Sequence, residues 1–104
     1  MQQTTIVVTA FMRARDMQST QVQNALLGLV EPTRAEPGCI VYDLYRSSDQ
    51  EGCFMFYECW HSRQALEEHL RKPYIRDFLR QADTLLAEPV RVSVWEKITE
   101  AAKR

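Results

Sequence analysis

Several features that identify common protein classes are scarce or absent in this sequence. Its 13 Lys and Arg residues against 14 Asp and Glu residues give a formal net charge of -1. Without a basic excess to hold phosphates, we expect no nucleic-acid partner. The longest apolar runs are short, so we expect no membrane span. The N-terminus lacks the basic start and apolar core of a signal peptide.

The three cysteines, Cys39, Cys53 and Cys59, form no recognisable framework. An odd number of widely spaced cysteines does not predict disulfides, and without a C-x-x-C pair they predict no metal site. We interpret them as small buried apolar residues, with a reactive thiol as the alternative. Reduced thiols and the missing signal peptide predict a cytoplasmic location.

Motifs for binding cofactors are missing as well. There is no glycine-rich phosphate loop, no HExxH and no GxSxG, and only three glycines occur in all. The sequence therefore predicts no metal site, no conventional nucleotide or flavin site and no cofactor.

The residues that are present suit one globular domain covering 1–104. Hydrophobic residues make up 45% of the chain and charged residues 26%, which is typical of a folded domain. A chain this short leaves little interior for a closed substrate cavity. This is a first indication that a partner subunit helps to enclose any site.

Four segments rich in β-branched and aromatic residues predict strands. They are residues 4–13, 39–47, 53–60 and 90–98. Between the first two, apolar residues recur with the spacing of one buried helix face: Val22, Ala25, Leu26, Leu29 and Val30. Pro32 either kinks this helix or starts a last short turn, and Glu36-Pro37-Gly38 is a stop signal.

A second helical region follows Ser62, whose hydroxyl can cap it, and Pro73 divides it in two. Residues 99–104 form a polar tail. The element order is β-α-β-β-α-β. It predicts an α+β, ferredoxin-like fold, with a four-stranded antiparallel sheet and its helices on one face.

The uncovered face of this sheet is predicted to be apolar. Strand 53–60 places Phe54, Phe56 and Trp60 on one face. Its other face carries Cys53, Met55, Tyr57 and Cys59. An exposed apolar sheet face of this size usually marks an interface. We therefore expect a homodimer with the two sheets packed face to face.

Four polar or aromatic residues are candidates for chemistry: Glu58, Trp60, His61 and His69. Glu58 shares a strand face with Trp60, so it is a carboxyl in apolar surroundings, where its pKa tends to rise. His69 shares a helix face with Leu66 and can exchange protons near neutral pH. The alternatives are structural: a paired Glu58, a Trp60 in the core and a hydrogen-bonded core His69. We expect His61 to be exposed in a loop.

Three motifs follow one another along the chain. They are Glu36-Pro37-Gly38-Cys39 with Tyr42, then Phe56-Tyr57-Glu58-Cys59-Trp60, then Ala65-Leu66-Glu67-Glu68-His69-Leu70-Arg71-Lys72-Pro73. The pattern E-P-G-C-x-x-Y, E-x-W, H-x-x-x-P resembles the antibiotic biosynthesis monooxygenase family. The resemblance extends from about Ile6 to Trp95.

The resemblance implies a dimeric α/β barrel with a pocket between sheet and helices in each subunit. It also implies oxidation of a small aromatic or quinol-type substrate by molecular oxygen, without flavin, metal or haem. Related members degrade haem with an Asn, Trp and His set. Trp60 and His69 match two of these, but the first strand has residues such as Thr9 in place of the Asn. That departure disfavours haem degradation.

A cofactor-free mechanism assigns a role to each candidate. His69 is the base or proton shuttle, and Glu58 orients a partner or holds a polar group. Trp60 walls in the ring, while Tyr42, Tyr74 and Thr9 are further substrate-binding candidates. Two other functions stay open. One is an isomerase or tautomerase of a small carbonyl compound, and the other is a non-enzymatic ligand-binding dimer.

Overall fold

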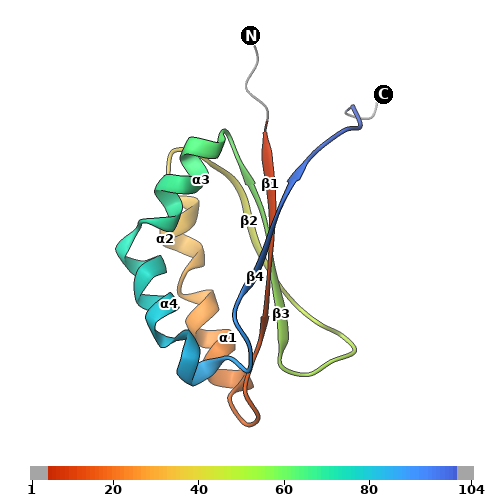
Figure 1. Cartoon of the computed structure of the whole chain (residues 1–104), viewed down its shortest axis with the longest axis vertical. Helices are drawn as coiled ribbons and strands as arrows, with labels where there is room; N and C mark the ends of the chain where they lie inside the picture. The colour runs from red at the N-terminus through yellow and green to blue at the C-terminus, as the bar shows by residue number, and fades with distance from the viewer. Residues whose placement is uncertain (1–4, 101–104) are drawn as a thin grey trace.

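A computed structural model describes residues 5–100 of the chain and contains four strands and four helices (Figure 1). In chain order they are β1 Ile6–Arg13, α1 Ser19–Leu27, α2 Val30–Arg34, β2 Cys39–Arg46, β3 Cys53–Trp60, α3 Arg63–Leu70, α4 Pro73–Leu85 and β4 Arg91–Glu96. Thr4, in the predicted first strand, and residues 101–104 of the predicted tail lie outside the described range. The predicted β-α-β-β-α-β order is confirmed, each α being two consecutive helices.

The four strands form one antiparallel sheet in the order β2-β3-β1-β4. The two strands that are central in space are therefore the first and third in sequence. Figure 1 shows all the helices on one face of this sheet, with the other face uncovered. This confirms the predicted ferredoxin-like α+β fold.

Prolines and a cap residue set where the helices begin. Pro32 lies in the first turn of α2, where amide hydrogens have no partner within the helix. It therefore belongs to the short last turn that was one of its two predicted roles. The Ser62 hydroxyl caps α3 by accepting a hydrogen bond from the Ala65 amide at 3.1 Å. Pro73 occupies the first position of α4, which separates it from α3.

The core lies between the sheet and the helices. The inward-facing side chains of β1 and β3 and the apolar stripes of the helices are buried together: Val8, Ala10, Met12, Phe54, Phe56, Trp60, Val22, Leu26, Leu66, Ile75 and Phe78. Trp60 has no exposed surface. The alternation predicted for residues 53–60 is confirmed, because the even-numbered residues of β3 face the helices.

Helix α3 lies unusually close to the backbone that leads into β2. A Cβ atom on Gly38 would collide with the Cβ of Ala65. The Gly38 carbonyl oxygen also accepts a hydrogen bond from the His61 amide at 2.9 Å, just before α3. Because His69 lies one turn after Ala65, this contact helps to fix the position of His69 above the sheet.

The uncovered face of the sheet is rich in aromatic side chains. Phe11, Tyr45, Tyr57 and Trp95 are 36–55% exposed on it. The Arg91 guanidinium lies 5.9 Å from the centre of the Phe11 ring. The predicted apolar character of this second face is therefore present in one subunit. None of the helices within residues 5–100 is long and apolar enough to cross a membrane.

Candidate active site

A cavity of about 360 Å³ lies between the sheet and the helices. Its lining is apolar except for Tyr42, Glu58, His69 and Asp83. Leu70, Leu79 and Val92 line it and are also 45–53% exposed, so they mark where the cavity opens between α3, α4 and β4.

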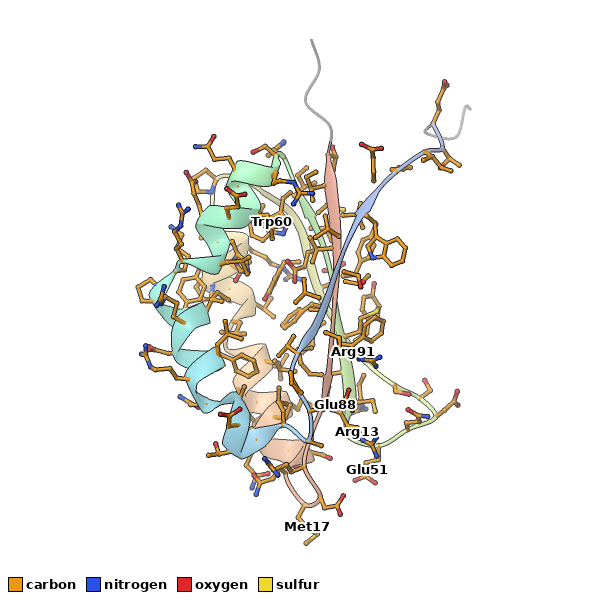
Figure 2. All side chains as sticks on the ribbon, viewed as in Figure 1. Arg13, Met17, Glu51, Trp60, Glu88 and Arg91 are labelled. Atoms are coloured by element: carbon orange, nitrogen blue, oxygen red, sulfur yellow. The ribbon has the colours of Figure 1, made fainter. Side chains whose placement is uncertain are left out.

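A second hollow of about 450 Å³ lies on the other side of the sheet and contains none of the candidate catalytic residues. Arg13, Glu88 and Arg91 contribute to it (Figure 2). We place the candidate active site in the enclosed apolar cavity, because binding there removes a ligand from water.

His69 projects from α3 into the buried end of the cavity and is 3% exposed. Its Nδ1 atom lies 2.9 Å from Glu36 Oε2. Its ring centre lies 4.5 Å from Trp60 and 5.6 Å from Tyr42. Burial lowers the pKa of His69 below 6.5, and the opposing effect of Glu36 does not cancel this. The imidazole is therefore neutral at pH 7 and able to accept a proton.

Glu58 projects from β3 into the same cavity and is 5% exposed. Its Oε1 accepts a hydrogen bond from Trp60 Nε1 at 2.9 Å. Figure 2 shows Trp60 between the helices and the sheet. Burial raises the pKa of Glu58 from 4.5 to about 7. The bond from Trp60 opposes this rise in part, and the charge of Glu36 adds to it. Glu58 can therefore donate or accept a proton near neutral pH.

The raised pKa of Glu58 predicts a stability effect that depends on pH. The unfolded chain releases this proton near pH 4.5 and the folded protein near pH 7. The stability that the protonated Glu58 contributes is therefore complete below pH 4.5 and is lost as pH rises to about 7. This difference corresponds to about 3 kcal/mol. Glu58→Gln should remove that part of the slope.

Urea unfolding between pH 4 and pH 8, on wild type and Glu58→Gln, measures the effect. Comparing the two proteins cancels the contribution of other titrating groups. The exposed Glu67 provides the matched control, since Glu67→Gln should keep the wild-type slope. Equal slopes in wild type and Glu58→Gln would contradict the assignment.

The structure brings four of the predicted site residues together: Tyr42, Glu58, Trp60 and His69. Tyr42 is 3% exposed and stacks on Phe56 with ring centres 4.4 Å apart. Burial raises the pKa of Tyr42 well above 10, so its hydroxyl keeps its proton. Trp60 does not itself line the cavity. It packs behind Glu58 and His69 and contacts both.

The other predicted residues lie elsewhere. Thr9 is on the uncovered face of the sheet, where its hydroxyl accepts a hydrogen bond from Trp95 Nε1 at 2.9 Å. Tyr74 does not line the cavity. Its hydroxyl donates to Glu36 and lies 3.2 Å from the Pro32 carbonyl oxygen. His61 is exposed, as predicted.

Glu36 is the residue that sequence patterns did not assign to the site. It lies 33 positions before His69, is 9% exposed and binds both His69 and Tyr74. In the sequence it belongs to the helix-stop segment and to the motif pattern, and neither gives it a role. Its burial beside a proline and a glycine is the one unusual feature, since glutamate is rarely buried without a partner.

These features define a class of protein: a ferredoxin-like domain with a small-molecule cavity between its sheet and helices, lined by a buried histidine and a buried carboxyl. The comparisons with known proteins agree. Residues 5–81 match the family model described as antibiotic biosynthesis monooxygenase. The chain belongs to the antibiotic biosynthesis monooxygenase family.

Individual relatives show how far the similarity extends. "Putative monooxygenase Rv0793" of Mycobacterium tuberculosis is 38% identical over 92% of this chain and 93% of its own length. Its solved structure superimposes with a TM-score of 0.87, 36% identity and coverage of 94% and 99% of the two chains. The structure of PA3566 from Pseudomonas aeruginosa gives a TM-score of 0.89, 27% identity and coverage of 95% and 99%.

A relative in Synechocystis, "Uncharacterized protein sll1783", is 39% identical over 68% of this chain. The match spans 48% of that relative's length. The family and fold are therefore common to these proteins, while the substrate is a separate question.

Proposed function

We propose that this protein is a monooxygenase that oxidises a small aromatic or quinol-type substrate with molecular oxygen. The observation that carries the proposal is a neutral, buried His69 lining an apolar cavity beside Glu58. An apolar cavity favours a flat hydrocarbon ring, and a histidine at its buried end favours a ring that carries an acidic hydroxyl. Membership of the family supports the oxidative chemistry.

In this proposal His69 accepts the proton of the substrate hydroxyl. The resulting phenolate is electron-rich and reduces oxygen, and the substrate supplies all the electrons. One oxygen atom enters the ring and the other leaves as water, so that a hydroquinone and O₂ give a hydroxyquinone and water. Glu58 holds a second polar group of the substrate, and Tyr42, which keeps its proton, donates a hydrogen bond to developing negative charge.

Because the substrate supplies the electrons, the proposed reaction requires no flavin, metal or haem. The apolar walls of the cavity keep water away from the reactive phenolate. Thr9 lies on the other face of the sheet from His69 within one subunit, so we propose no role for it in the same cavity.

We further propose that the working unit is a homodimer with the two sheets packed face to face. Phe11, Tyr45, Tyr57 and Trp95 support this, because together they expose aromatic surface that a second copy would bury. A covered sheet would also stiffen the floor of the cavity on the opposite side.

Oxygen consumption tests the proposed reaction. Purified protein, incubated with a panel of simple hydroquinones and monophenols, should consume one O₂ per molecule of product. With ¹⁸O₂, the product should gain one labelled atom and the water the other. Elemental analysis and an absorption spectrum should show no stoichiometric metal or flavin in the active protein, and either one would overturn the cofactor-free mechanism.

The isomerase alternative predicts a different result. A small carbonyl substrate would then exchange carbon-bound hydrogen for deuterium in heavy water without consuming oxygen. That exchange, with no oxygen uptake on any phenol or hydroquinone tested, would contradict the monooxygenase proposal.

A further inference from the structure

A buried chain of hydrogen bonds holds His69 from the side away from the cavity. Glu36 precedes β2, His69 is on α3 and Tyr74 is on α4. Glu36 Oε2 lies 2.9 Å from His69 Nδ1 and also accepts from the Tyr74 hydroxyl. The side chains of Glu36 and His69 are 7% and 4% exposed. The contact therefore joins three separate segments in a region of low solvent access.

We propose that Glu36 is a positioning residue that fixes the tautomer of His69 so that Nε2 is the proton-accepting atom in the cavity. This inference rests on the proposed role of His69 as the base. A single carboxylate oxygen that accepts from two partners carries no proton itself, so His69 must donate through Nδ1. A neutral imidazole with its proton on Nδ1 leaves Nε2 unprotonated.

The geometry leaves Nε2 available to a ligand. Within residues 5–100, His69 makes no side-chain hydrogen bond other than the one through Nδ1. Trp60 and Tyr42 pack against the ring, so the ring cannot rotate freely to exchange its two nitrogens. Nδ1 faces Glu36, which does not line the cavity, whereas His69 itself does.

The same contact prepares the site for the charge that proton transfer creates. When Nε2 takes a proton, His69 becomes a cation in a buried position, which is costly without a counter-charge. Glu36 supplies that counter-charge at hydrogen-bond distance, in the way that a buried carboxylate supports the histidine of a catalytic triad. Tyr74 holds the carboxylate from α4, so Glu36 keeps its place whether His69 is neutral or charged.

Other titratable groups surround His69 and must be considered in any pH measurement. They come from β2, β3, the α3–α4 junction, α4 and the segment before β2: Tyr42, Glu58, Lys72, Tyr74 and Glu36. Lys72 acts in the direction opposite to Glu36 and lowers the pKa of His69. Glu36 is the one that hydrogen-bonds to the ring, so its removal should have the largest effect.

The first test requires no substrate. Two-dimensional ¹⁵N–¹H spectra of the imidazole rings, recorded on ligand-free wild-type protein at pH 7.5, distinguish the two neutral tautomers. Exposed His61 provides the internal comparison. We expect the Nδ1–H form for His69. An Nε2–H form would overturn the inference whatever the activity of the protein. The Nδ1–H form without any oxygenation would instead contradict the proposed function alone.

The second test is Glu36→Gln, which keeps the shape of the side chain and removes its charge. The pKa of His69 should fall by about 1–3 units. On the substrate found by oxygen uptake, kcat should fall roughly 10- to 100-fold with KM nearly unchanged. Glu67→Gln on the exposed side of α3 is the matched control and should change neither.

A purely structural Glu36 would give another pattern: lower thermal stability, with the His69 pKa and kcat per folded molecule unchanged. That pattern would overturn the inference. If Glu36→Gln does not fold, Tyr74→Phe serves instead, because it loosens Glu36 without removing it. It should lower kcat less than His69→Ala does and keep the Nδ1–H tautomer, and a full loss of that tautomer preference with unchanged kcat would count against Glu36.

Discussion

Replacing His69 with alanine should reduce turnover by roughly 10²–10⁴-fold, the range typical of general acid–base groups. The cavity has no second base in the same place. Glu58 is the nearest candidate, but its pKa of about 7 and its bond from Trp60 make it a weak acceptor near neutral pH. The loss should therefore persist at every pH where the protein is folded.

The same substitution should also lower stability. Glu36 would keep Tyr74 as a partner but lose His69, and an unsatisfied buried group costs about 1–3 kcal/mol. Activity must therefore be expressed per folded molecule, with the folded fraction taken from urea unfolding of the same sample. His61→Ala is the matched control, because His61 is exposed just before α3, and it should change neither quantity. A destabilised but fully active His69→Ala would remove His69 from the mechanism.

A lysine in place of Tyr57 should convert a dimer into monomers. Light scattering of the wild-type protein should give twice the 12.2 kDa mass of one chain. Tyr57 is on β3, a central strand, and its side chain is on the uncovered face. In a dimer packed through this face, Tyr57→Lys would bury an ammonium group against apolar surface. Such a burial costs several kcal/mol, so dissociation should become on the order of 10³-fold stronger.

The monomer should remain folded in this variant. Tyr57 is 36% exposed in the single subunit, and its neighbour across the β2–β3 pair is Asp43, which can pair with a lysine. Tyr57→Phe is the matched control and should stay dimeric. A wild-type mass of one chain, or a Tyr57→Lys protein that keeps twice that mass, would contradict the proposed sheet-to-sheet dimer.

The fold could be predicted from the sequence because its signals are local. Alternation in 53–60 gave the two faces of β3, and the helical spacing of Leu66 and His69 placed both on the buried side of α3. Ser62 and Pro73 sit at the helix starts that their chemistry favours. Each of these inferences depends on residues within about one turn or a few positions.

The parts of the site that could not be predicted depend on distant contacts or on an ambiguous pattern. Glu36 meets His69 across 33 positions, and no local spacing encodes that contact. In β1, the even and the odd residues are both largely apolar, so the pattern did not reveal which set faces the helices. Thr9 belongs to the set that faces away, and this is why the structure separates it from His69.

The close approach of Gly38 to Ala65 limits how the cavity can change in size. At the His69 end, the spacing between α3 and the sheet is set by backbone in contact with a methyl group, so a larger residue there would have to lift the whole helix. At the other end, Met12, Ala82 and Val92 line the cavity with side chains alone. Substitutions there can enlarge or shorten it while the backbone stays in place. Selectivity for longer or shorter substrates is therefore best engineered at that end.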